Sequence, residues 1–381
     1  MKRGAKYVLL ACVGLLLHVP FSIMGAARAQ ALPLGETAVA SVLTCGAGDD
    51  FYTTFGHTAL RITDTAAGID NVYNYGTFDF DTPHFYWKFM RGQLDYMLGR
   101  TTFRRFVRSY RAEGRAVWEQ RLLLTPQEVN NLYLMLEWNY EPENRYYRYD
   151  LFRDNCATRI RDVVASACGK QEIAYDAWEG HSYRYWLHAA TAGGCLEWWI
   201  VGVDMLLGLP ADHVCDNAES MFYPLSMMTL YAGATRGAAP LVASSEELLQ
   251  DTRVPLSRSF PPVVVFALLF AVVAVLTWLR KLPRWVDRTL YVMAGVLGCF
   301  LLFMWFGTSH YCTAWNLNIL WASPLLLLIA IRMERSPLWA LWLQEACFAV
   351  AAVWVVVCGL SLALLPVIFM LALRVATLLR R

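Results

Sequence analysis

Hydrophobic and polar positions divide the chain into three stretches. Near the start, a basic segment precedes a short apolar run that ends at Leu17, and the tripeptide Ala27-Arg28-Ala29 follows. This pattern predicts a signal peptide over residues 1–29, with an uncleaved anchor helix as the alternative. Charged and aromatic residues are concentrated between residues 30 and 259, whereas residues 260–381 are almost continuously apolar. We therefore expect an exported domain over residues 30–259 and a transmembrane domain over residues 260–381.

Small polar islands divide the apolar region into segments of membrane-spanning length, which is about 20 residues. Every second connection between these segments is basic, and basic loops remain in the cytoplasm. The pattern predicts a multi-pass membrane protein, with the basic loops in the cytoplasm and residues 30–259 outside. We expect five spans, at residues 260–280, 289–308, 315–331, 338–357 and 359–379.

Two short stretches of the exported domain are typical of a β-hairpin. Residues 58–63 and 70–75 have strand-like composition, and a four-residue connection that ends in glycine lies between them. In a regular hairpin this length places Ala59 opposite Asn74. Alternation with a period of two then puts His57 and Asn74 on the same face of the sheet. We therefore expect Asn74 to orient the imidazole of His57.

A second motif places a cysteine at the start of a helix. Asp154-Asn155-Cys156 precedes a helical stretch over residues 157–167, which Gly169 ends. A capping side chain before the cysteine would leave the thiol near backbone N–H groups and the positive end of the helix dipole. We expect this environment to lower the pKa of the Cys156 thiol. A histidine base and a thiolate suit acyl transfer through a thioester, and an inert buried cysteine is the alternative.

Residues 84–111 interleave aromatic and basic side chains, among them Lys88 and Arg91. A helix of this composition suits a membrane surface, where cations lie near lipid phosphates. An ordinary amphipathic helix with a solvated basic face is the alternative. In the outward loop over residues 307–318, we expect His310, Asn316 and Asn318 to cover an active site, with His310 and Asn318 as candidates for substrate binding. A polar loop at the lipid surface is the alternative.

The exported domain contains an odd number of cysteines, which are Cys45, Cys156, Cys168, Cys195 and Cys215. If four of them pair in an oxidising compartment, Cys156 is the most sensible free thiol, and five reduced cysteines are the alternative. The histidines lack the spacing of known zinc motifs, so we expect no metal and no other cofactor. A formal net charge of +2 gives no indication of a nucleic-acid partner.

Taken together, these motifs resemble the circularly permuted papain-like fold of lecithin:retinol acyltransferase and its relatives, in which the histidine strand precedes the cysteine helix. More closely, the chain resembles integral-membrane lipoprotein N-acyltransferases that carry an N-terminal periplasmic domain. The resemblance covers nearly the whole chain after the signal peptide, and it is carried by Thr44-Cys45-Gly46, Phe55-Gly56-His57-Thr58-Ala59-Leu60-Arg61, Tyr86-Trp87-Lys88-Phe89-Met90-Arg91-Gly92, residues 149–159, residues 202–208, Met221-Phe222-Tyr223-Pro224 and residues 316–325.

The resemblance implies transfer of a fatty acyl chain from a phospholipid to the α-amine of a diacylglyceryl lipoprotein, with Cys156 as nucleophile and His57 as base. It also implies a bacterial inner membrane with the catalytic domain on the periplasmic side. From their positions in the basic stretch and in the cysteine motif, we further expect Lys88, Arg91 and Arg159 to bind substrate. The expected fold is an α+β, permuted papain-like domain followed by a bundle of about five transmembrane helices. A cysteine peptidase or amidase that acts on cell-wall peptide is the main alternative, and a non-catalytic binding module is another. A wall hydrolase needs at most one anchor, so five spans favour the acyltransferase.

Overall fold

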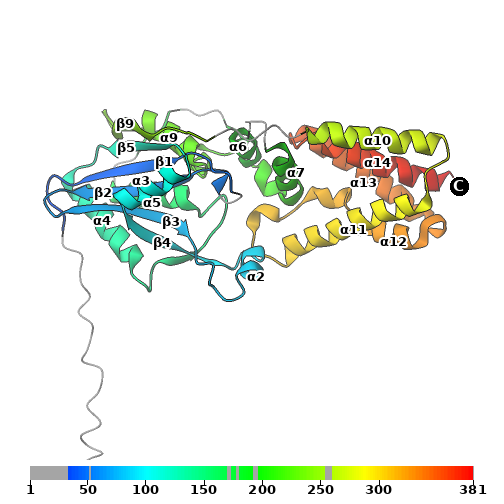
Figure 1. Ribbon diagram of the computed structural model, residues 1–381, viewed down its shortest axis with the longest axis horizontal. Helices are drawn as coiled ribbons and strands as arrows, with labels where there is room; N and C mark the ends of the chain where they lie inside the picture. Colours follow the sequence, from blue (N-terminus) through cyan, green and yellow to red (C-terminus); the bar gives the residue numbers. More distant parts are fainter. Residues whose placement is uncertain are drawn as a thin grey trace, which may run out of the picture. The chain divides into compact units, whose positions relative to one another are not determined.

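A seven-stranded antiparallel sheet forms the centre of the exported domain in the computed structural model (Figure 1). The structure describes residues 33–50, 53–169, 173–176, 180–191, 196–253 and 260–380, so the predicted signal peptide lies outside the described residues. The strand order is β6-β4-β3-β2-β1-β5-β9. The strands are β1 (Val39–Cys45), β2 (His57–Asp64), β3 (Ile69–Thr77), β4 (Asp95–Thr102), β5 (Val117–Leu122), β6 (Tyr146–Arg148) and β9 (Val242–Leu249).

The β2–β3 hairpin has the register that the turn length predicts. Leu60 pairs with Tyr73, and the same register continued by one residue would bring Ala59 opposite Asn74. His57 and Asn74 therefore lie on the same face of the sheet, as expected. The pairing with β3 begins at Leu60, which leaves the first residues of β2 free to face another element.

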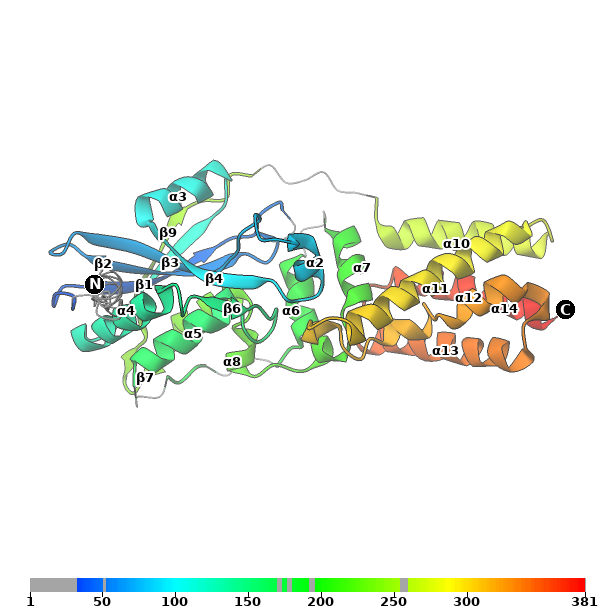
Figure 2. The same ribbon diagram turned by 90° about the horizontal axis from the view of Figure 1, so that it is seen from below.

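Helices cover both faces of this sheet. Figure 2 shows α3 (Phe103–Ala112) on one side of the strands, with α4 (Pro126–Tyr140) and α5 (Cys156–Ala167) on the other. On the second side, Asn139 of α4 donates a hydrogen bond of 3.0 Å to the hydroxyl of Tyr75. On the first side, Phe106 of α3 belongs to a buried cluster with Ala59 and Val72. The His57 face is therefore the face that α3 partly covers.

The prediction of a helix over residues 84–111 is wrong for the middle of this range. The region forms α2 (Phe85–Met90), then β4, then α3, which begins after Thr102 accepts a hydrogen bond from the Arg105 N–H. Residues 95–102 pair with β3 on one side and with β6 on the other, and Leu98 is fully buried. Sheet pairing thus overrides the helical pattern of aromatic and basic residues, because propensity is weaker than tertiary packing.

Between α5 and β9 the chain forms short helices and a small two-stranded sheet. Two of these helices, α6 and α7, lie next to the membrane segments in the contacts described below. The elements are α6 (Tyr183–Ala190), α7 (Glu197–Leu206), η2 (Leu209–Asp212), α8 (Asn217–Ser220), α9 (Pro224–Gly233), β7 (Thr235–Arg236) and β8 (Ala239–Pro240).

Residues 260–380 form apolar helices, of which α10, α13 and α14 pack side by side (Figure 1). Three segments of the described residues are long and apolar enough to cross a membrane: Arg284–Phe306, Tyr311–Arg335 and Leu338–Val357. The split of residues 338–379 into two helices is confirmed, whereas the count of five spans stays a prediction because α10 and α14 are shorter. The helices are α10 (Pro262–Trp278), α11 (Arg284–Phe306), η3 (Tyr311–Thr313), η4 (Leu317–Leu320), α12 (Leu325–Arg332), η5 (Met333–Arg335), α13 (Leu338–Val357) and α14 (Leu364–Leu379).

The cysteines of the exported domain that the structure describes are all reduced. Cys45, Cys156, Cys168 and Cys215 are buried free thiols, and Cys195 lies outside the described residues. Pairing of four of the five cysteines is therefore absent, and the alternative of reduced thiols holds for these four.

Candidate active site

Cys156 is the first residue of α5, and its neighbour Asn155 holds it there. The buried Asn155 side chain accepts hydrogen bonds from the N–H groups of Ala157 (2.9 Å) and Thr158 (3.0 Å). Its amide donates to the carbonyl oxygens of Leu151 and Phe222, both at 2.9 Å. All the hydrogen-bonding capacity of this amide is used, so the helix start is fixed to two other segments of the chain.

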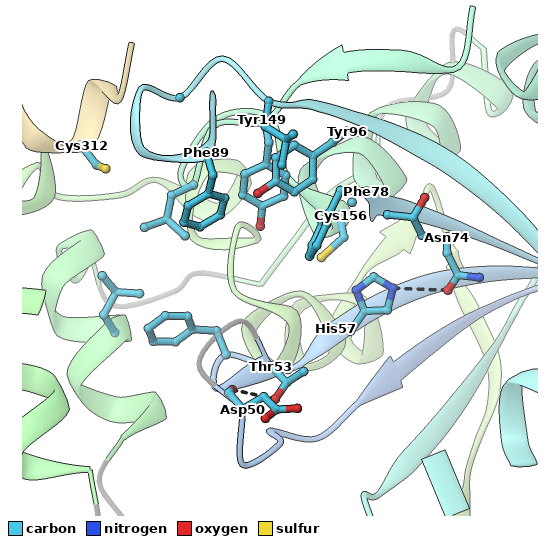
Figure 3. Close-up of a pocket in the computed structure, with 18 of the residues that line it drawn as sticks. Asp50, Thr53, His57, Asn74, Phe78, Phe89, Tyr96, Tyr149, Cys156 and Cys312 are labelled. Atoms are coloured by element: carbon cyan, nitrogen blue, oxygen red, sulfur yellow. Dashed lines mark hydrogen bonds between the residues drawn. The ribbon is translucent and has the colours of Figure 1, made fainter. Parts of the chain in front are cut away.

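His57 begins β2 and faces the cysteine. Its Nε2 atom lies 3.3 Å from the Oδ1 atom of Asn74. Because a carbonyl oxygen only accepts, this contact places the imidazole proton on Nε2 and leaves Nδ1 unprotonated. The sulfur of Cys156 lies on the side of the ring away from Asn74, toward Nδ1 (Figure 3). Cys156, His57 and Asn74 are thus brought together in the arrangement of a nucleophile, a base and a positioning residue.

The backbone immediately before His57 admits only glycine. Gly56 has a φ of +79°, and a Cβ atom there would lie 2.6 Å from the carbonyl oxygen of Cys45. Cys45 pairs with His57 across β1 and β2, so this contact is part of the base's own support. Glycine lets the chain turn into β2 close enough to β1 to aim the imidazole at Cys156.

Burial holds both reacting groups in their neutral forms. It lowers the pKa of His57 to about 4, a shift that the Asn74 hydrogen bond opposes and the Arg115 charge reinforces. Burial also raises the pKa of the Cys156 thiol, although the N–H groups of Thr58, Ala157 and Cys156 itself favour the thiolate. The expectation of a lowered thiol pKa is therefore wrong, because desolvation outweighs the helix start. Both groups are therefore uncharged before any reaction.

A cavity of about 930 Å³ opens from this pair, and most of its lining is apolar. The exported domain contributes Phe55, Phe89 and Val203, and α11 contributes Phe300 and Met304. Phe300 lies six residues before the last residue of α11. At 1.5 Å per residue, the cavity thus reaches about 9 Å below the outer end of a candidate span. The cavity thus extends from His57 and Cys156 to the wall of a candidate membrane span.

Of the predicted substrate-binding residues, His310 lines the cavity, whereas Lys88 and Arg91 do not. The Nε2 atom of His310 lies 3.1 Å from the carbonyl oxygen of Phe89. Arg91 donates from Nε to the carbonyl oxygen of Gly307 at 3.2 Å, so it joins α2 to the end of α11. Lys88 is half-buried on the same short helix.

Arg159 and Asn318 also lie outside the cavity lining. Arg159 forms two hydrogen bonds with Asp154, of 2.5 and 2.7 Å, and so braces the segment before Cys156. The fully buried Asn318 donates to the backbone oxygen of Asp204 at 2.8 Å and accepts from the indole of Trp321 at 2.7 Å. These contacts join the membrane segments to α7.

Two buried charged groups near the cavity, Arg115 and Asp204, were not predicted from the sequence as residues of the site. Arg115 donates to the carbonyl oxygen of Gly46 from Nε and Nη2, at 3.0 and 2.8 Å, and it lines the cavity. The fully buried Asp204 carboxylate accepts from Arg184 at 2.8 Å and from the Ser361 N–H at 2.7 Å. Asp204 could have been identified from the sequence, because it is a single carboxylate within an apolar run. A charge that is buried in such a run needs a partner. Nothing in the local sequence marks Arg115. Among the described residues, no group of three or more His, Cys, Asp or Glu side chains could hold a metal ion.

Two family models match the chain. The Lnb N-terminal periplasmic domain matches residues 34–189, which include Cys156, His57 and Asn74. The Lnb transmembrane domain matches residues 255–381, which include the α11 wall of the cavity. Neither the curated proteins nor the solved structures contain a significant match.

Proposed function

The chain belongs to the Lnb family of apolipoprotein N-acyltransferases, and from this premise we propose that it acylates exported lipoproteins through a thioester on Cys156. The donor is a phospholipid, and the acceptor is the α-amine of a diacylglyceryl N-terminal cysteine. The observation that carries the proposal is the apolar cavity between the His57–Cys156 pair and α11, because an acyl chain in the bilayer could reach the thiol through it. The protein acts in the inner membrane with its active site on the periplasmic side.

In the first half-reaction, Cys156 attacks an ester carbonyl of the phospholipid. His57 Nδ1 takes the thiol proton as the carbon–sulfur bond forms, since neither group is charged beforehand. The N–H groups of Cys156 and Thr58, which favour a thiolate at this position, are our candidates for the donors that stabilise the oxyanion. The carbon–oxygen bond of the ester then breaks, His57 returns the proton to the leaving oxygen, and lysophospholipid departs.

In the second half-reaction, the α-amine of the lipoprotein attacks the thioester. An α-amine has a pKa near 8, so a useful fraction is neutral at physiological pH. His57 receives a proton from the attacking nitrogen, the carbon–sulfur bond breaks, and the thiol is restored with an amide as product. The apolar lining favours this outcome over hydrolysis, because it keeps bulk water from the thioester.

Fold and residue roles follow from the same proposal. A His57 strand that precedes a Cys156 helix, with both on one antiparallel sheet, supports a permuted papain-like domain. His310 is placed to contact the donor chain inside the cavity. Lys88 is a candidate contact for the donor phosphate, whereas Arg91, Arg159 and Asn318 support the site through protein contacts.

Incubation of the purified protein with phospholipid alone is expected to leave an acyl chain on Cys156 that hydroxylamine removes. A diacylglyceryl peptide with a free N-terminus should discharge it, and mass spectrometry should find the chain on the peptide α-amine. The control is the same peptide with an acetylated α-amine, which should leave the thioester intact. Absence of the thioester, together with cleavage of cell-wall peptide, would instead favour a cysteine amidase.

Replacement of Gly56 by alanine is expected to lower the rate of thioester formation by more than about tenfold. The new Cβ would meet the Cys45 carbonyl oxygen at 2.6 Å, and backbone strain at such positions costs roughly 1–3 kcal/mol. Because the strain falls beside the base, His57 should move away from Cys156.

Gly68 is the matched control for this substitution. It has a φ of +67° in the hairpin turn, but its Cβ would meet no atom within 4 Å. Gly68→Ala should therefore lower the melting temperature without changing the acylation rate. Equal acylation rates in the two variants would show that Gly56 does not position the base.

A further inference from the structure

The short helix α2 has one side on the cavity and another open to the surroundings. Phe89 and Met90 line the cavity beside the reacting pair. Tyr86 is 82% exposed and Trp87 is 51% exposed, and neither lines the cavity. Phe80, in the segment that leads into α2, is 62% exposed. We call Phe80, Tyr86 and Trp87 the outer face of α2.

Contacts with the membrane segments set the level at which α2 lies. The Trp87 ring stacks on Phe303 of α11, with ring centroids 6.2 Å apart. The Ser309 N–H donates to the carbonyl oxygen of Arg91 at 2.8 Å, and Arg91 donates to Gly307. These partners lie in the last turn of α11 or just beyond its end. The helix α2 is therefore held at the end of a candidate span.

Exposed aromatic rings from the membrane segments lie at the same end of α11. Phe306 is 74% exposed, and it stacks on Trp305 with ring centroids 4.7 Å apart. Trp315 is 62% exposed and lies 4.9 Å from Trp305. Aromatic side chains gather at membrane–water interfaces, because their rings suit the level of the headgroups. The outer face of α2 reaches this end of α11 through the stack of Trp87 on Phe303.

We propose that the acyl chain of a bilayer phospholipid enters the cavity from the outer leaflet between α2 and α11 and so reaches Cys156. We call this entrance, which α2 borders, the doorway. This inference rests on the proposed function. The outer face of α2 lies among the lipid headgroups, and its inner side forms the wall of the cavity. Phe300 of α11, Phe89 of α2 and Cys156 line the same cavity, so a chain that enters between α2 and α11 has an apolar wall to follow to the thiol.

The helix α3 supplies a contrast within the same chain. It carries four exposed arginines but no large exposed hydrophobic side chain, and it packs on β3 and β4. A position on α3, such as Arg104, should therefore lie in water even though the helix is basic. This makes Arg104 a suitable reference for the depth of Tyr86.

The first experiment measures the depth of α2 in the membrane. Nitroxide labels are attached at Tyr86→Cys or Arg104→Cys in the full chain in phospholipid vesicles, in a Cys156→Ala, Cys299→Ser background. The same background without an added cysteine supplies the signal to subtract. The label at position 86 should be relaxed more by oxygen than by a water-soluble nickel chelate, and the label at position 104 should show the reverse. Equal exposure to the nickel chelate at both positions would overturn the doorway.

The second experiment separates the doorway from the chemistry. Tyr86→Asp should slow thioester formation from vesicle phospholipid at least about tenfold, because a carboxylate opposes insertion at headgroup level. It should leave acylation of Cys156 by water-soluble p-nitrophenyl butyrate within about twofold of the unchanged protein. Tyr86→Phe should keep both rates. Tyr146→Asp is the matched control, since Tyr146 is 55% exposed on β6 and does not line the cavity.

The outcomes distinguish this inference from the proposed function. If the unchanged protein forms no thioester with phospholipid, the acyltransferase proposal fails. If it does, and Tyr86→Asp reacts with vesicle phospholipid at the same rate, the doorway alone is wrong. Loss of both reactions in Tyr86→Asp would also contradict the doorway, because the substitution would then act on the reacting pair.

Discussion

Replacement of Cys156 by alanine is expected to abolish acyl transfer, with a loss on the order of 10³-fold or more. The reason is that Cys156 is the thiol that His57 faces, whereas Cys312, which also lines the cavity, lies apart from His57 (Figure 3). Cys45 is buried beside His57, but burial raises the pKa of its thiol to about 12, so it is a poor substitute. Mass spectrometry of a lipoprotein N-terminal peptide, from cells with each variant, measures the outcome.

Cys156→Ser is expected to be nearly as inactive. A hydroxyl is far less acidic than a thiol, and a histidine whose pKa is about 4 is too weak a base to activate it. Both variants should still insert and accumulate, because serine and alanine fit the first turn of α5. Substantial transfer by Cys156→Ala would rule out a covalent mechanism at this residue.

Replacement of His57 by alanine is expected to lower the rate of thioester formation by about 10²–10⁴-fold, the usual contribution of a positioned base. Asn74→Ala should lower it less, because Asn74 sets the tautomer through its 3.3 Å contact but moves no proton. Pre-steady-state acylation of Cys156 by p-nitrophenyl butyrate measures both rates. Rates close to that of the unchanged protein in both variants would remove His57 as the base.

The pH dependence supplies an independent test of the same assignment. Because the pKa of His57 is lowered to about 4, the imidazole stays neutral and able to accept a proton down to that pH. The acylation rate of the unchanged protein should therefore fall only as the pH drops through about 4, rather than near the ordinary histidine value of 6.5. The residual rate of His57→Ala should lack this acid limb.

Several features of the site followed from local sequence. The hairpin register followed from a four-residue connection and a period of two, and it correctly brought Asn74 to His57. The helix that starts at Cys156 followed from the capping ability of Asn155. Both depend on interactions within a few residues, or on one turn of known length. Such interactions are fully specified by adjacent side chains and backbone geometry.

Other features depended on contacts between distant parts of the chain. The sequence pattern over strand β4 predicted a helix. These residues form a strand because they pair with β3 and β6, which the local pattern does not reveal. The raised pKa of Cys156 reflects burial by the surrounding fold, which a helix start does not reveal. Arg91 and Asn318 were expected to meet substrate, but their partners are backbone oxygens more than 100 residues away.

The sequence by itself predicted the order of the domains, proposed His57 and Cys156 as the reacting pair, and determined the hairpin register that brings Asn74 to His57. Only the tertiary structure decided that residues from positions 57, 156 and 300 line one cavity, and that α2 covers it at the end of α11. The physical reason is that periodicity and capping act over a few residues. Desolvation and cavity shape, in contrast, arise when segments far apart in the chain pack together.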